Sequence, residues 1–142
     1  MNAFLPLADI VKISDEELEF ITGKTNIEEA LPSLLQENTK CVVYTQWGKM
    51  VLQYIQKNLK AVSQEYCVDV VDTTGAGASF IGTFEYQLLR DGVENIETVS
   101  KETFEEYLEF ANAYAAYTTT KAGALSSMAT ASEMEEWLGK IR

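Results

Sequence analysis

Residues 72–80 read DTTGAGASF, a run of small residues between an apolar stretch, YCVDVV at 66–71, and an amphipathic one. The apolar stretch predicts a β-strand, and residues 79–90 predict a helix. A glycine-rich turn between a strand and a helix is suited to binding an anion, because the first N–H groups of a helix are unpaired and carry the positive end of its dipole. Gly75 and Gly77 permit positive φ and a close approach of phosphate.

The turn does not match two well-known nucleotide-binding motifs. A Walker A loop needs Gly-Lys-Ser/Thr, and no lysine follows here, while the dinucleotide fingerprint G-x-G-x-x-G fails at Phe80. Phosphate or another anion is the expected ligand. A tight strand-to-helix turn without a ligand is the alternative.

The composition narrows the function classes. The chain has 142 residues, 46% hydrophobic and 23% charged, which fits one globular domain with a hydrophobic core. Its net charge of −11 disfavours nucleic acid and anionic membrane as partners. Apolar runs stay well short of the roughly 20 residues of a membrane span, and the N-terminus lacks a basic signal-peptide start. We therefore expect a cytoplasmic protein.

The chain contains no histidine, which excludes Ser–His and Cys–His nucleophile systems and His-ligated metal sites. Its two cysteines, Cys41 and Cys67, each lie in a β-like apolar run. Buried, reduced thiols are the expected state of both.

Capping signals and periodicity predict the order of elements. Ser14 with Glu17 is a capping box for a helix that ends at Gly23, and Thr25 and Thr130 begin further boxes. The expected strands are 9–13, 41–45, 50–55, 59–64 and 66–71, with turns at 47–49 and 57–58, and the expected helices are 14–23, 25–37, 79–90, 102–121 and 132–141. This order predicts an α/β fold with a mixed sheet.

Several ordered motifs resemble the ribokinase-like (pfkB) carbohydrate kinases, most closely the fructokinases. DTTGAGASF is similar to their signature D-T-x-G-A-G-D-S/T-F at every position but 78. ADIVKISDEELEFITG (8–23) resembles the segment after the sugar-binding half, VVYTQWGKM (42–50) the strand and turn beside the nucleotide, and FANAYAAYTTTKAGALSSM (110–128) the helix and loop around the adenine.

This resemblance implies the C-terminal half of a ribokinase-like three-layer Rossmann-type sandwich, with a mixed sheet and flanking helices. Residues 1–142 would form a single nucleotide-binding domain, without the N-terminal sugar-binding half. The intact parent would transfer the γ-phosphate of Mg-ATP to a sugar hydroxyl. ATP and Mg2+ are then the expected cofactors, together with K+ in some relatives.

The resemblance also implies roles for individual residues. Gly75, Ala76 and Gly77 would form an anion hole for the transferring phosphoryl group. Ser14 and Glu17 match an N-x-x-E motif that tunes magnesium and phosphate binding. Thr45 and Gly48 would lie beside the nucleotide, and Asn112 and Ala115 would lie at the adenine. The positions implied around a monovalent cation are Asp72, Thr74, Gly123 and Ser127. Each set has a structural alternative, namely a helix cap, a strand end, helix packing or a loop.

The chain departs from the family pattern at three positions. Ala78 replaces the aspartate that acts as general base, and a methyl group cannot accept a proton. Loss of a general base lowers a rate by a factor on the order of 10²–10⁴. Val51 replaces the second glycine of the turn after Thr45, and Ala129 stands where a proline is usual.

Three functional hypotheses follow. The first is a C-terminal portion of a fructokinase-like sugar kinase, inactive alone because of Ala78. The second is a truncated pseudokinase or interaction module that binds nucleotide without turnover. The third is a folding unit with neither ligand nor partner. Under the first two, the expected partners are a nucleotide and either a separate N-terminal half or a second copy, docked on an exposed sheet edge.

Overall fold

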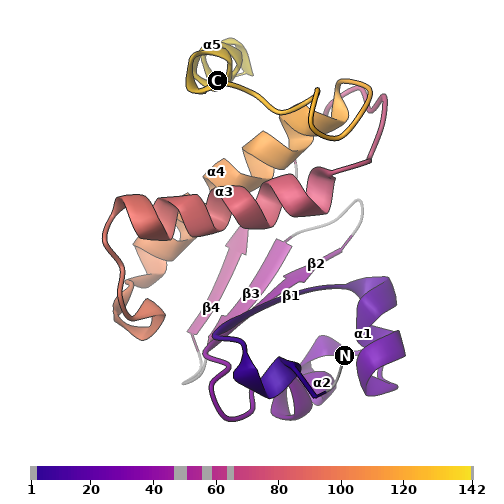
Figure 1. The fold of residues 1–142 in the computed structure, drawn as a ribbon, viewed down its shortest axis with the longest axis vertical. Coiled ribbons are helices and arrows are strands. Elements are labelled where there is room, and N and C mark those ends of the chain that lie inside the picture. Colours follow the sequence, from indigo (N-terminus) through magenta and orange to yellow (C-terminus); the bar gives the residue numbers. More distant parts are fainter. Residues whose placement is uncertain (1–2, 47–50, 56–58, 64–65, 142) are drawn as a thin grey trace. The chain divides into compact units, whose positions relative to one another are not determined.

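The computed structural model describes residues 3–46, 51–55, 59–63 and 66–141. These residues fall into two compact units (Figure 1), Met1–Ser63 with Val93–Glu105 and Gln64–Gly92 with Glu106–Arg142. Each unit has its own packing and is described separately. The single domain expected over 1–142 stays a prediction. The predicted turns at 47–49 and 57–58, with Gly48, lie outside the described residues.

The first unit contains a mixed sheet, as the sequence predicts. Its described strands are β1 (Ile10–Ser14), β2 (Cys41–Thr45), β3 (Val51–Ile55) and β4 (Leu59–Ser63), in the order β1-β2-β3-β4. β1 pairs with β2 in parallel, while β2 with β3 and β3 with β4 pair antiparallel. β1 is therefore an edge strand of the described sheet, although it is parallel and both Val11 and Ile13 are buried.

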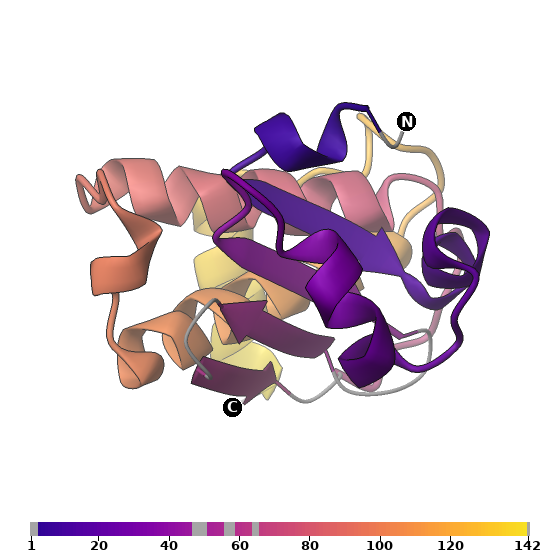
Figure 2. The same ribbon diagram turned by 90° about the horizontal axis from the view of Figure 1, so that it is seen from below.

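Two helices cover one face of this sheet, α1 (Asp15–Thr22) and α2 (Ile27–Leu34), as Figure 2 shows. The core between them and the strands consists of Ile13, Leu18, Ile27, Ala30, Leu34, Val42 and Tyr44. The unit also contains two short 3-10 helices, η1 (Leu5–Leu7) and η2 (Ile96–Thr98).

The capping box of α1 is confirmed. The Ser14 hydroxyl accepts the Glu17 N–H at 3.2 Å, and the Glu17 carboxylate accepts the Ser14 N–H at 2.8 Å. Gly23 ends the helix with φ of 69°. The helix predicted from Thr25 to Glu37 is wrong at both ends, because the Asn26 side chain caps α2 by accepting two N–H groups, and the helix stops at Leu34.

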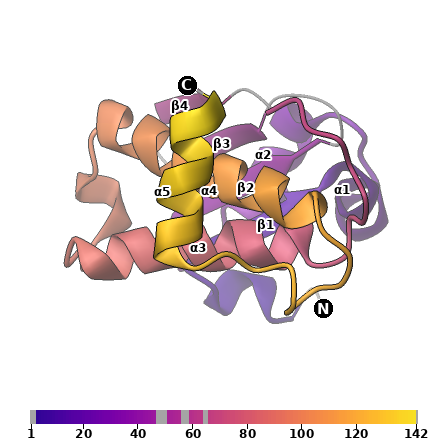
Figure 3. The same cartoon turned by 90° about the horizontal axis from the view of Figure 1, so that it is seen from above.

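The second unit is helical, with α3 (Ala76–Arg90), most of α4 (Lys101–Thr119, which begins in the first unit) and α5 (Ala131–Ile141). α3 and α4 lie side by side, since Gln87 Nε2 donates to the Tyr107 carbonyl at 2.9 Å and the Phe84 and Tyr107 rings meet edge to face. α5 packs on α4 (Figure 3), where Met134 is buried with Ala113 and Tyr117. The predicted capping box of Thr130 and Glu133 is confirmed.

Two further predictions in this unit are wrong. Residues 66–71 form no strand; the Val71 and Asp72 N–H groups instead donate to the Thr119 carbonyl. A strand requires a partner strand, which the apolar pattern of this segment cannot supply by itself. Cys67 is exposed rather than buried, whereas Cys41 is buried as expected. In the described part of the chain, no helix is long and apolar enough to cross a membrane.

Candidate functional site

The glycine turn begins α3 and presents unpaired N–H groups. Gly75 is the N-cap, with φ of 85° and ψ of −6°. The Ala76 N–H donates to Thr73 and the Ser79 N–H to Gly75, but those of Gly77 and Ala78 donate to no other described residue. Gly77 lies within the helix and does not use the positive φ that a glycine permits. Two such N–H groups at the positive end of a helix are able to bind an anion.

A glycine is required at position 75 for two reasons. The left-handed backbone there disfavours any L side chain. In addition, a Cβ at this position would lie 3.2 Å from the Cα and Cβ atoms of Ala124. The glycine turn therefore packs tightly against the loop that follows α4.

Asp72 joins the same two segments. Its Oδ1 accepts the Thr74 N–H at 2.9 Å, and its Oδ2 accepts the Gly123 N–H at 2.9 Å. The Thr74 hydroxyl, with the N–H groups of Gly123 and Thr74, lowers the pKa of Asp72 to about 2. The carboxylate is therefore ionised throughout the neutral range.

The four positions matched to a monovalent cation lie on these two loops. Ser127 is fully buried, and its hydroxyl donates to the Ala124 carbonyl at 2.7 Å. The side-chain oxygens of Asp72, Thr74 and Ser127 all take part in hydrogen bonds within the protein. Among the described residues, no group of three or more His, Cys, Asp or Glu side chains could hold a metal ion.

Ser14 and Thr45 lie side by side in the first unit, because they are register partners in parallel strands. Both are at the carboxyl ends of their strands, which is where open α/β sheets bind ligands. Glu17 is used as a cap here, since it accepts the Ser14 N–H and lies 3.6 Å from Lys12 Nζ. The Ser14 N–H and the charge of Lys12 lower the pKa of Glu17, although partial burial opposes this.

Asn112 and Ala115 are three residues apart on α4 and therefore share a face of that helix. Asn112 is buried and Ala115 is half-buried. Both belong to the second unit with the glycine turn, whereas Ser14, Glu17 and Thr45 belong to the first. The site residues predicted from the sequence are thus grouped within each unit, and their roles toward a nucleotide stay predictions.

Ala78 is exposed, as the third residue of α3. The first turn of α3 contains no acidic residue. The first turn of α3 therefore has N–H donors for an anion and no carboxylate.

The sequence did not indicate two residues that support the glycine turn. The Thr119 carbonyl accepts the N–H groups of Val71 and Asp72, at 2.8 and 3.1 Å, and Ala124 packs against Gly75. Both contacts join segments about 50 residues apart and involve backbone atoms or a methyl group. Such contacts leave no local sequence signal.

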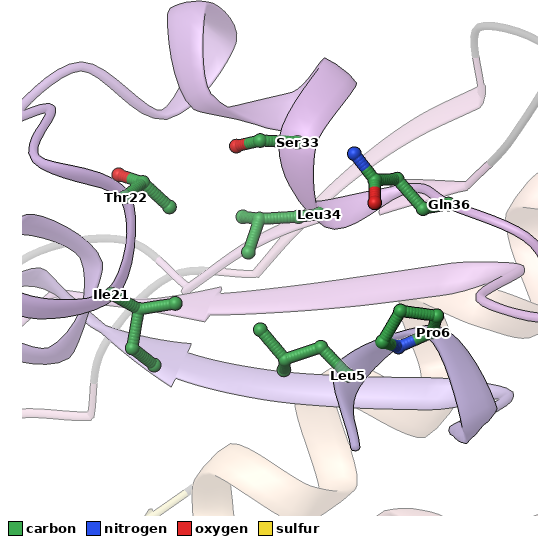
Figure 4. A pocket seen from close by; sticks show the side chains of 7 residues that line it. All are labelled: Leu5, Pro6, Ile21, Thr22, Ser33, Leu34 and Gln36. Atoms are coloured by element: carbon green, nitrogen blue, oxygen red, sulfur yellow. The ribbon is translucent and has the colours of Figure 1, made fainter. Parts of the chain in front are cut away.

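A pocket of about 230 Å³ lies elsewhere, in the first unit (Figure 4). Its lining residues are Leu5, Pro6, Ile21, Thr22, Ser33, Leu34 and Gln36, which include none of the predicted site residues. The Thr22 and Ser33 hydroxyls each donate to a carbonyl of their own helix. The pocket shares no lining residue with the candidate anion site.

The fold defines the class of the protein. The chain superposes on a Xylella fastidiosa fructokinase with bound ATP with a TM-score of 0.85, at 24% identity, over 96% of this chain and 44% of that one. It superposes on a Vibrio cholerae fructokinase in a fructose, ADP and calcium-bound form with a TM-score of 0.81, at 31% identity, over 96% and 42% of the two chains. It therefore has a ribokinase-like α/β fold, as the sequence predicts.

The family follows from the sequence comparisons. Residues 1–131 match the pfkB family of carbohydrate kinases, and this chain belongs to that family. It is 41% identical over 132 residues to the probable fructokinase-2 of Arabidopsis thaliana, and 38% identical over 129 residues to fructokinase-2 of Solanum lycopersicum. These matches cover 92% and 89% of this chain but 39% and 38% of the relatives, so the chain spans well under half of their length.

Proposed function

We propose that this chain is the nucleotide-binding portion of a fructokinase-like sugar kinase and that it binds the phosphates of Mg-ATP at the glycine turn. The observation that carries the proposal is the pair of unpaired N–H groups, at Gly77 and Ala78, beyond the left-handed Gly75. Oriented N–H groups stabilise negative charge on a phosphoryl group without reorganising during the reaction. Family membership makes the phosphate of a nucleotide the favoured anion.

The remaining contacts to the nucleotide are proposed from the family pattern. Thr45 would border the nucleotide at the end of β2, and Asn112 and Ala115 would line the adenine pocket from α4. Mg2+ would supply charge neutralisation between the phosphates, held mainly by phosphate oxygens, since Glu17 is engaged in its helix cap. Backbone carbonyl oxygens near Asp72 and Gly123 would be the ligands of K+.

We further propose that this chain alone does not turn over substrate. The sugar hydroxyl must lose a proton as it attacks phosphorus, and Ala78 offers no acceptor for it. The same observation favours one alternative, a pseudokinase or interaction module that binds nucleotide and works by association.

The proposed polypeptide partner docks at β1. This strand pairs in parallel with β2 and has Val11 and Ile13 buried on one face, yet it is an edge of the described sheet. The curated relatives are more than twice as long as the part that this chain matches. We propose a polypeptide corresponding to their N-terminal part as the partner, with a second copy of this chain as the alternative.

Thermal denaturation with and without Mg-ATP tests the nucleotide proposal. A ligand that binds only the folded state raises the midpoint, by an amount that grows with its concentration. We expect a rise at millimolar Mg-ATP and a smaller one with Mg2+ alone. An unchanged midpoint would contradict a working nucleotide site and would favour the folding unit without a ligand.

Restoration of the general base tests the kinase proposal. The variant Ala78→Asp is mixed with an N-terminal fragment from a fructokinase relative, and phosphorylation of fructose by ATP is measured. We expect activity in the mixture with the variant and about 10²–10⁴-fold less with the unaltered chain. A complex that forms but shows equal, background rates with both would favour the interaction module.

A further inference from the structure

Asp72 lies between the two loops of the second unit that surround the glycine turn. On one side, its Oδ1 closes a local turn by accepting the Thr74 N–H. On the other, its Oδ2 reaches 51 residues along the chain to accept the Gly123 N–H at 2.9 Å. The carboxylate thus joins the segment that leads into α3 to the loop that leaves α4.

Other contacts strengthen the same junction. The Asp72 N–H donates to the Thr119 carbonyl, so this residue contacts the second loop through its backbone as well as its side chain. Gly75 packs against Ala124 of that loop, and a Cβ at Gly75 would lie only 3.2 Å from it. Gly123 itself has φ of 91°, and a Cβ there would lie 2.5 Å from Ser126 Oγ. The two loops are therefore joined by a backbone hydrogen bond, a side-chain hydrogen bond and a packing contact.

We propose that Asp72 is a positioning residue, whose carboxylate holds the glycine turn and the Gly123 loop in the one arrangement that leaves the Gly77 and Ala78 N–H groups directed at an anion. The inference rests on the proposed function, because it assigns a role within the phosphate site. In this role the carboxylate contacts protein N–H groups rather than the ligand.

Simple electrostatics makes the opposite prediction, which allows a sharp test. A carboxylate near an anion site repels the anion, so its removal alone strengthens phosphate binding. If Asp72 instead organises the turn, its removal weakens binding in spite of the lost negative charge. The sign of the change therefore separates positioning from a general charge effect.

The variant Asp72→Asn isolates the contact between the loops. Its amide oxygen can still accept the Thr74 N–H, but its NH2 group would face the Gly123 N–H, where a donor cannot replace an acceptor. Asp69→Asn is the matched control, because it removes one exposed negative charge three residues away on the same segment. Affinity is measured with tripolyphosphate, which probes the anion site, and with adenosine, which does not, under conditions where circular dichroism shows all variants folded.

We expect Asp72→Asn to bind tripolyphosphate about tenfold more weakly, the effect of losing one hydrogen bond to a charged group, while Asp69→Asn binds it as tightly as the unaltered chain or more so. Adenosine affinity should change little in either variant. Equal or tighter tripolyphosphate binding by Asp72→Asn would overturn the inference. A parallel loss of both affinities would do the same, since it would indicate a general structural defect.

Amide hydrogen exchange provides a readout that needs no ligand. In Asp72→Asn, we expect faster exchange at Gly123, with the Thr74 amide less affected, and no change in Asp69→Asn. Unchanged protection at Gly123 overturns the inference even if nucleotide binds. If the unaltered chain binds neither Mg-ATP nor tripolyphosphate, the proposed function fails and so does the anion-directing role, whereas faster exchange at Gly123 would still establish the contact between the loops.

Discussion

Gly75 is the residue at which local backbone conformation and tertiary packing impose the same requirement. Its φ of 85° favours glycine, and a Cβ there would make a tight contact of 3.2 Å with Ala124. We expect Gly75→Ala to lower the free energy of unfolding by at least about 1–2 kcal/mol from the backbone alone, with an added penalty from the contact with Ala124. Urea unfolding monitored by circular dichroism measures the change.

Gly82 on the same helix is the matched control. It is exposed in the middle of α3, and a Cβ there would contact nothing within 4 Å. Because alanine is the better helix former, Gly82→Ala should raise the free energy of unfolding by up to about 1 kcal/mol. Destabilisation of similar size in both variants would contradict the special conformation assigned to Gly75.

At the residue scale, the sequence predicts the glycine turn but not its support. The motif indicates that Gly75 can adopt the positive φ that it has, and it shows that Ala78 offers no proton acceptor. The carboxylate of Asp72 could not be assigned, because its partner, the Gly123 N–H, is 51 residues away in the chain. The sequence also could not show that Gly77 is helical, since glycine permits either conformation.

Helix caps decide where the elements of the first unit begin. The Asn26 side chain accepts the N–H groups of both Glu28 and Glu29, at 2.8 and 3.3 Å. We expect Asn26→Ala to lower the free energy of unfolding by about 1 kcal/mol. Thr25→Ala, at the cap expected from the sequence, should change it by less than half as much. The reverse ranking in chemical denaturation would restore the sequence-based assignment.

The junction of α3 and α4 has a pH dependence that can be worked out. Asp91 accepts a paired hydrogen bond from Arg90 and one from the Tyr107 hydroxyl at 2.6 Å, and these lower its pKa to about 2 from 3.8. A lowered pKa in the folded state stabilises the fold above pH 3.8, and this contribution is lost as the pH falls toward 2.

The comparison of the unaltered chain with Asp91→Asn measures this contribution. The difference between their unfolding midpoints in urea should be constant from neutral pH to about pH 4 and should then shrink. A difference that stays constant down to pH 2.5 would show that Asp91 contributes through packing rather than through its charge.

At the element scale, prediction succeeds where the signal is local. The capping boxes at Ser14 and Thr130 each involve two residues only three positions apart, and both form as expected. The segment 66–71 has a strand-like composition but forms no strand, because strand formation depends on a neighbouring strand. Thr25 and Asn26 are both good caps by type, and the packing of Ile27 into the core selects the second.

On the scale of the whole molecule, β1 is the strand at which we expect another polypeptide to bind. Unpaired backbone groups at the edge of a sheet are a template for pairing with another chain. We expect the chain to self-associate in size-exclusion chromatography in a concentration-dependent way. An N-terminal fragment of a fructokinase relative should replace this association with a one-to-one complex. A docking role for β1 would be contradicted if the chain is monomeric at every concentration and forms no complex with the fragment.

The central claim is that the glycine turn of this pfkB-family chain holds the phosphates of a nucleotide. Amide NMR spectra recorded during a titration with Mg-ATP test it most directly. We predict that the resonances of Gly77 and Ala78 shift in a saturable way and that those of the exposed Gly82, further along α3, shift much less. Resonances at Gly77 and Ala78 that do not move at millimolar Mg-ATP would contradict the claim.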